Sequence, residues 1–148
     1  MRNILYIIFF SLIVANCSFK PVVKHHGVPF LEKKQASLII NKSNKNDIIK
    51  ILGAPSTESI LEEDLWIYIE SRKSKSSLLK LGKEITLTSN VLVLEIDKKG
   101  ILKNKKFYNI DDQNKISFNK DETKMSDKDS FIYGVISSLR QKVDSQKK

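Results

Sequence analysis

Cys17 is the residue whose type and position say most about the chemistry of this 148-residue chain. It is the only cysteine, so it can form neither an intrachain disulfide nor a cysteine-rich zinc site. Residues 4–15 before it are apolar except for Ser11, and Arg2 precedes them. As a helix this run would span about 18 Å, which is too short for the ~30 Å hydrocarbon core. Its length is typical of the apolar part of a signal peptide.

The residues just before Cys17 match the processing signal of a bacterial lipoprotein. Val14 and Ala15 are small or aliphatic, as the signal peptidase requires, whereas Asn16 stands where Gly, Ala or Ser is usual. In such a signal the thiol receives a diacylglyceryl group and the chain is cut before the cysteine. We therefore predict removal of residues 1–16 and a lipid anchor on Cys17. The alternative is an ordinary secretory peptide with an incidental cysteine.

Ser18 follows the predicted anchor, where an aspartate would retain a lipoprotein in the inner membrane. We therefore expect the protein at the outer membrane, lipid-anchored and facing the periplasm. Residues 17–27 are interpreted as a tether. His25 and His26 lie within it, and two adjacent histidines cannot both face one metal from a helix or strand. They are interpreted as solvated side chains.

The formal net charge is +9, from 26 basic and 17 acidic residues. Only three of the basic residues are arginines: Arg2, Arg72 and Arg140. The planar guanidinium group of arginine is the side chain that best donates paired hydrogen bonds to base edges and phosphates. A signal peptide also contradicts a cytoplasmic location, so we predict no nucleic-acid partner. The lysines instead favour solubility and attraction to anionic headgroups.

Catalytic motifs are missing from the sequence. It contains no nucleophile elbow, no glycine-rich phosphate loop and no HExxH motif. The acidic runs at residues 62–64 and 111–112 lie in polar stretches and are interpreted as solvated surface. We therefore predict that the chain is not an enzyme and holds no metal. The only cofactor expected is the covalent lipid on Cys17.

Two helices are predicted early in the expected domain. The first covers residues 29–40, with a proline in its first turn. The second begins at Asn44, a favourable N-cap, and Asp47 three residues later comes close to the capping-box pattern. Gly53 provides its C-terminal turn, and Pro55 prevents its continuation.

A strand hairpin is predicted after these helices. Trp66 and Tyr68 alternate along a β-branched and aromatic run and are interpreted as core residues. Gly100 closes a tight turn between two further extended runs, which predicts an antiparallel hairpin. The predicted strands are residues 65–71, 91–97 and 101–108.

The C-terminal part is predicted to be a polar linker followed by a helix. Residues 111–124 show no clear period, whereas Phe131, Val135 and Leu139 recur at helical spacing. Gly134 weakens this amphipathic helix. Two uses remain open for its apolar face: packing on the domain, or docking on a partner.

The order of these motifs resembles the SmpA/OmlA (BamE) family of outer-membrane assembly lipoproteins. The resemblance is carried by N-K-N-D-I-I-K-I-L-G-A-P at residues 44–55, L-W-I-Y at 65–68 and the D-x-x-G hairpin at 91–107. His26-Gly27 and the late F-I-x-G-V-I helix resemble the alphaproteobacterial branch. The chain departs from the family at Asn41-Lys42, where a glycine is usual. It also departs after the W-x-Y strand, where the family arginine falls at Ser71 or at Arg72.

The resemblance implies an α+β fold of two helices packed on a three-stranded antiparallel sheet, to which a C-terminal amphipathic helix is added. One face of such a sheet is buried under the helices. The expected organisation is a signal peptide at 1–16, a tether at 17–27, the domain at 28–110, and a linker with the C-terminal helix at 111–148. The expected core residues are Ile48, Ile49, Leu52, Trp66, Tyr68, Leu92, Leu94 and Ile96.

The function implied is that of a non-catalytic subunit of the complex that assembles β-barrel proteins in the outer membrane. Its partners would be the other subunits and outer-membrane phospholipid. Ile67, Arg72, Leu78 and Leu79 are the expected partner or phospholipid contacts. Because a fold does not fix a function, a periplasm-facing binding module or an inhibitor-like lipoprotein is the alternative.

Overall fold

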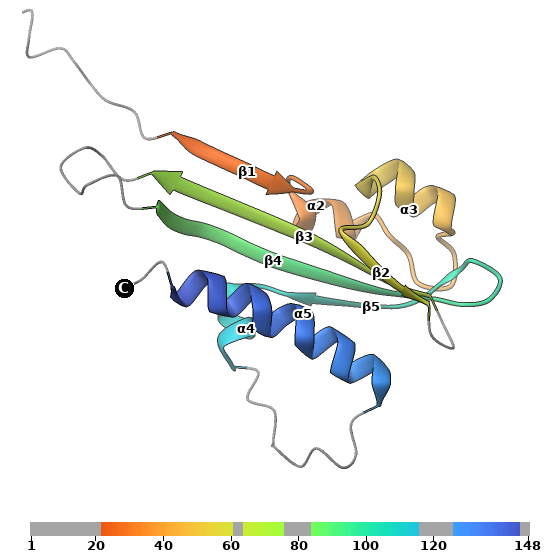
Figure 1. The fold of residues 1–148 in the computed structure, drawn as a ribbon. Coiled ribbons are helices and arrows are strands. Elements are labelled where there is room, and N and C mark those ends of the chain that lie inside the picture. Colours follow the sequence, from red (N-terminus) through yellow and green to blue (C-terminus); the bar gives the residue numbers. More distant parts are fainter. Residues whose placement is uncertain (1–21, 61–63, 76–83, 116–125, 146–148) are drawn as a thin grey trace, which may run out of the picture.

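The computed structural model describes residues 22–60, 64–75, 84–115 and 126–145 (Figure 1). Helices combine with an antiparallel sheet, so the α+β class predicted from the sequence is confirmed. The elements are β1 (Val23–Gly27), α2 (Leu31–Ala36), α3 (Lys45–Leu52), β2 (Thr57–Ile60), β3 (Asp64–Lys75), β4 (Glu84–Ile96), β5 (Leu102–Tyr108), α4 (Ile110–Lys115) and α5 (Asp127–Asp144).

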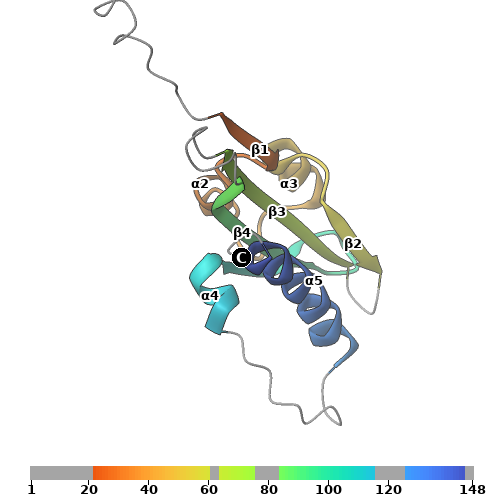
Figure 2. The same ribbon diagram turned by 60° about the vertical axis from the view of Figure 1, so that its left-hand side comes forward.

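The sheet has the order β1-β3-β4-β5, and all its pairings are antiparallel. β2 also pairs with β3, so β1 and β2 lie in tandem along one edge of β3. Figure 2 shows α2 and α3 on one side of this sheet and α4 and α5 on the other. The sheet is therefore the middle of three layers.

The face under α2 and α3 holds the larger buried cluster. Trp66 pairs with Leu94 and Tyr68 with Leu92, so these four side chains point to the same face. Of the eight predicted core residues, only Ile49 was wrong. It is 47% exposed, because Ile48 and Leu52 form the buried stripe of α3 and Ile49 lies outside it. The cluster comprises Val28, Leu31, Leu38, Ile48, Leu52, Trp66, Tyr68, Leu92, Leu94, Ile96 and Leu102.

The opposite face is covered by the C-terminal helix. Ile132 and Ile136 of α5 are buried against a second cluster, and the predicted stripe residues Phe131, Val135 and Leu139 pack beside them. Of the two uses left open for this helix, the structure shows packing on the domain. The sheet contributes Leu65, Ile67, Val91 and Val93 to this cluster.

The predicted helix and turn signals around α3 are confirmed. The Asn44 side chain accepts a hydrogen bond from the Asp47 amide at 3.0 Å, and the Asp47 carboxylate accepts one from the Asn44 amide at 3.0 Å. Gly53 ends the helix at φ 83°, a conformation that other residues rarely adopt. Gly100 has φ 79° in the turn between β4 and β5.

The strand number differs from the prediction, because the sheet has five strands and not three. β1 lies inside the stretch that the sequence predicts as a tether, and β2 lies in the polar stretch before β3. Both are short and polar, V-K-H-H-G and T-E-S-I. They are held by backbone pairing with β3, and such edge pairing leaves no hydrophobic pattern in the sequence.

Two helical segments also differ from the prediction. α2 covers Leu31–Ala36 and not residues 29–40. It begins after Phe30, because Phe30 takes a left-handed conformation with φ 58°. α4 covers Ile110–Lys115, at the start of the stretch predicted to be irregular. Its start is capped by Asn109, whose side chain accepts hydrogen bonds from Asp111 and Asp112 at 2.8 Å.

Candidate interaction surface

β3 carries both of the predicted contact residues that the structure describes, and it places them on opposite faces. Ile67 lies on the α5 face and is fully buried, so it has no exposed surface to offer a partner. This corrects the expectation that Ile67 is a surface contact. It is covered because α5 packs over the face to which the odd-numbered residues of this part of β3 point. Cys17, Leu78 and Leu79 lie outside the described residues.

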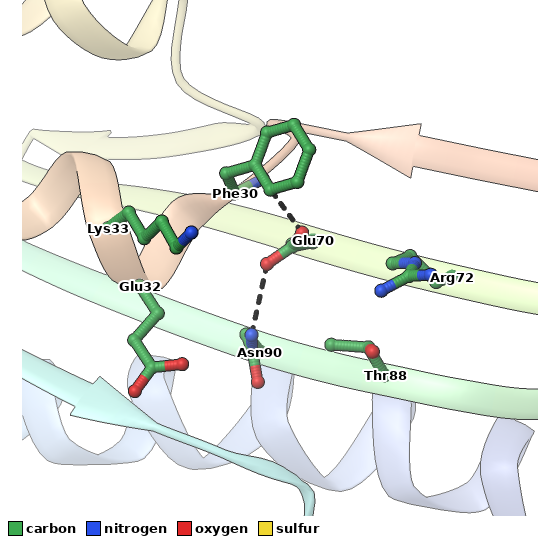
Figure 3. A pocket seen from close by; sticks show the side chains of 7 residues that line it. All are labelled: Phe30, Glu32, Lys33, Glu70, Arg72, Thr88 and Asn90. Atoms are coloured by element: carbon green, nitrogen blue, oxygen red, sulfur yellow. Dashed lines mark hydrogen bonds between the residues drawn. The ribbon is translucent and has the colours of Figure 1, made fainter.

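Glu70 is the most unusual residue on the α2 face. Glu70 is 5% exposed, and its carboxylate accepts hydrogen bonds from the backbone amides of Phe30 at 2.8 Å and Leu31 at 3.2 Å. The side-chain amide of Asn90 donates a third bond at 3.0 Å (Figure 3). α2 has no side-chain N-cap of its own, so a glutamate 40 residues away caps it. Three donors satisfy a buried charge that would otherwise be costly.

Gly27 allows the chain to pass from β1 into α2 beside β3. It has φ 77°, and a Cβ placed there would lie 1.9 Å from the carbonyl oxygen of Ile69. The amide of Val28 donates to that same oxygen at 3.0 Å. Only glycine fits this close backbone approach, which sets Phe30 and Leu31 over Glu70.

Arg72 lines a surface pocket next to Glu70. The pocket has a volume of about 170 Å³, and Figure 3 shows the side chains around it. The Nε of Arg72 is buried and has no hydrogen-bond partner among the described residues. Such a donor is suited to an acceptor group brought by another molecule. The pocket is lined by Phe30, Glu32, Lys33, Glu70, Arg72, Thr88 and Asn90.

The predicted motif residues Gly53, Trp66 and Tyr68 are brought together at the other end of the face. The Tyr68 hydroxyl donates to the carbonyl oxygen of Gly53 at 3.0 Å, which ties the end of α3 to β3. Burial, and to a smaller degree the negative charge of Glu58, raises the pKa of Tyr68 to about 12. Lys45 lies 5.6 Å from the centre of the Trp66 ring. These contacts hold α3 against β3, and the side chains of Trp66 and Tyr68 are buried.

The described residues contain no group of three or more His, Cys, Asp or Glu side chains that could hold a metal ion. Across the ranges 22–60, 64–75, 84–115 and 126–145, no helix has the length and apolar character needed to cross a bilayer.

Sequence reasoning singled out Arg72 but missed its surroundings. Side chains alternate between the two faces of a strand, and Glu70 lies two residues after Tyr68 and four after Trp66. Its position on the core face could therefore have been predicted from the sequence. The left-handed Phe30 and the long-range cap of α2 had no such signal.

Comparison with protein families gives a match over the middle of the chain. The model described as "Outer membrane protein assembly factor BamE domain" matches residues 29–106, more than half of the chain. The matched residues include α2, α3, β2, β3, β4 and most of β5, whereas α4 and α5 lie beyond them. No curated protein and no solved structure matches the chain.

Proposed function

This chain belongs to the BamE family of outer-membrane protein assembly factors, and from that premise we propose that it is a non-catalytic subunit of the complex that assembles β-barrel proteins. In this role it stabilises the complex at the periplasmic face of the outer membrane. Its partners are the other subunits of the complex and outer-membrane phospholipid.

The observation that carries the proposal is the extent of the family match. Residues 29–106 contain the helices α2 and α3 and nearly all of the sheet face on which they pack. The match therefore covers a whole structural unit with its own core, and not an isolated motif.

We place the anchor of this subunit on Cys17, with residues 1–16 removed. Two or three acyl chains on one residue hold a protein at a membrane durably, since each buried CH₂ contributes about 0.8 kcal/mol. Mass spectrometry of the mature N-terminus tests the anchor. An acylated Cys17 is the expected result, and an unmodified Cys17 or cleavage at another bond would contradict it. The variant Cys17→Ala provides the unlipidated reference.

Arg72 is the described residue that we propose as a partner or phospholipid contact. It lines the pocket beside Glu70, and Phe30 at the rim of the pocket is 61% exposed. Together they offer a buried donor without a partner among the described residues and an exposed aromatic ring. Arginine and aromatic side chains are enriched where proteins bind one another. Leu78 and Leu79, outside the described residues, remain part of the proposed contact.

Affinity purification from native membranes tests membership of the complex. The tagged chain is expected to recover the barrel subunit and the other lipoproteins. Arg72→Ala should lower this recovery, whereas Arg140→Ala should not. Arg140 is a matched control because it is an arginine on α5 whose described ion pair is with Asp144, four residues away.

An intact, membrane-bound chain that recovers no assembly subunit would contradict the proposal. A periplasm-facing binding module on the same fold would then be the better account. Equal losses from Arg72→Ala and Arg140→Ala would contradict only the contact assigned to Arg72.

A further inference from the structure

We propose that one end of the sheet docks on the bilayer surface, with the exposed side chains of Val23, Ile85 and Leu87 in the interface. This end holds the start of β1, the end of β3 and the start of β4 (Figure 1). The placement rests on the lipid anchor at Cys17 proposed above. It goes beyond that anchor because it assigns a membrane contact to the folded domain and fixes its orientation.

The first support is the length of chain between the anchor and the sheet. Val22 follows Cys17 by five residues, and five residues span at most about 18 Å even when fully extended. The amide of Lys75 donates to the carbonyl oxygen of Val22 at 3.1 Å, and Val23 pairs with Ser74. The end of β3 is therefore fastened to the point where the anchored chain enters the sheet. Lipid on Cys17 keeps this end close to the headgroups.

The second support is the apolar surface at this end. Val22 is 63% exposed, Val23 38%, Ile85 47% and Leu87 50%. Val23 and Ile85 both lie opposite Ser74, so they point to the same face of the sheet. Four of the nine large hydrophobic side chains that are exposed in the described residues thus gather at the anchored end. Exposed apolar groups that gather in one place mark an interaction site.

The third support is the charge around these side chains. Lys24 and Lys75 are exposed, and Lys73 forms an ion pair with Glu84 at 3.4 Å. Lysines can lay their apolar stems along an interface while the ammonium groups reach the headgroups. A surface with apolar residues framed by lysines fits an anionic bilayer, which attracts each nearby basic group.

Docking at this end would set the orientation of the whole domain. β3 has 12 residues, and a strand rises about 3.3 Å per residue, so its first residue lies about 36 Å from its last. α3, β2 and the turn at Gly100 would then be the parts farthest from the membrane. Arg72 and its pocket would lie near the headgroups.

Single cysteines in the lipidated full chain test this orientation. The native thiol is consumed by the lipid in a thioether, so a cysteine introduced by Leu87→Cys or Ile85→Cys is the only one that a dye can label. Ile49→Cys is the matched control, because Ile49 and Ile85 are both 47% exposed but lie at different ends of the domain. The dye responds to polarity, and the vesicles carry a quencher on their acyl chains.

In vesicles of phosphatidylcholine and phosphatidylglycerol, we expect blue-shifted and quenched emission at positions 85 and 87, and neither change at position 49. Adding Lys24→Gln or Lys75→Gln should lower the ratio of docked to undocked protein about fivefold for each lysine. Flotation of each sample with its vesicles is measured first, because it reports on the anchor alone.

Three outcomes would overturn the inference. If the chain floats but positions 85 and 87 respond like position 49, the anchor stands and the docking is wrong. If the chain does not float at all, the anchor is wrong and the docking falls with it. If the dyes respond only in native membranes that contain the assembly subunits, a protein covers this end in place of the bilayer.

Discussion

The two faces of the sheet are covered by different parts of the chain and are held in different ways. On the first face, α2 and α3 belong to the segment matched by the family model. On the second face, α5 lies beyond that segment. Both faces bury apolar side chains, so burial alone does not separate them.

Polar contacts to the sheet distinguish the two sets of helices that cover its faces, α2 and α3 on the first face and α4 and α5 on the second. On the first face, Glu70 caps α2, Tyr68 bonds to the end of α3, and Lys105 donates to the carbonyl oxygens of Gln35 at 2.8 Å and Leu38 at 2.9 Å. On the second face, the side-chain amide of Gln113 in α4 donates to the carbonyl oxygen of Ser89 at 2.9 Å, and Lys128 of α5 forms an ion pair with Glu95 at 2.7 Å. Long-range bonds to backbone groups of the helices fix α2 and α3 in place, whereas the ion pair of Lys128 joins α5 to the sheet. We infer that α5 opens at a lower cost than α2 and α3.

Leucines buried on opposite faces provide the strongest test of this difference. Leu92 is fully buried under α2 and α3, and Leu65 is 2% exposed under α5. Leu92→Ala should lower the free energy of unfolding by about 4 kcal/mol, and Leu65→Ala by about 2 kcal/mol, because a loosely held cover can collapse into the cavity. Urea unfolding measures both values. A larger loss from Leu65→Ala would reverse the comparison.

The first face was predictable from the sequence because its signals are local. Asn44, Asp47 and Gly53 mark both ends of α3, and the alternation through Trp66 and Tyr68 sets the register of β3. Ile49 was misplaced because an apolar residue beside a helical stripe looks the same in sequence as one within it.

The remaining parts depend on contacts between distant segments. β1 and β2 have no apolar period, since their bonds are to the backbone of β3. The alternation of side chains along β3 assigns Glu70 to the core face. The hydrogen bond by which Glu70 caps α2, however, connects residues that are 40 positions apart in the sequence. Ile67 was expected at the surface, although the continuous apolar run of residues 65–69 indicates that both faces of β3 are covered.

The two faces should also respond differently to alkaline pH. Burial raises the pKa of Tyr68 from 10.0 to about 12, so the folded state binds this proton more tightly than the unfolded state does. The stability that it contributes is complete below pH 10 and is lost as the pH rises to about 12, at about 1.4 kcal/mol per pH unit. Tyr108, beside the second cluster, also has a raised pKa, chiefly because of burial, with Asp129 and Glu95 adding to it.

Phenylalanine variants isolate the contribution of each tyrosine. Lysines also lose their charge in this range, so the informative quantity is the stability of the native chain minus that of Tyr68→Phe. This difference should fall between pH 10 and 12, and the corresponding difference for Tyr108→Phe should fall less because Tyr108 is only partly buried. A difference for Tyr68→Phe that does not change with pH would show that its hydroxyl titrates as it does in water.

The smallest expected effect compares two buried glutamates, one on each face. Glu70 is 5% exposed and accepts three hydrogen bonds, two of them from backbone amides, whereas Glu95 is 6% exposed and pairs with Lys128 of α5. Glu70→Gln should cost about 1.5 kcal/mol, because an amide group then faces donors that it cannot satisfy. Glu95→Gln should cost about 0.5 kcal/mol, since the ammonium of Lys128 remains partly in water.

Hydrogen exchange shows where each glutamate acts. Glu70→Gln should speed exchange at the amides of Phe30 and Leu31, which its carboxylate binds, and leave α5 unchanged. Glu95→Gln should speed exchange in α5 and leave α2 unchanged. If either variant sped up exchange equally in α2 and α5, the two faces would open together as one cooperative unit. The difference in their polar contacts would then not give them different local stabilities.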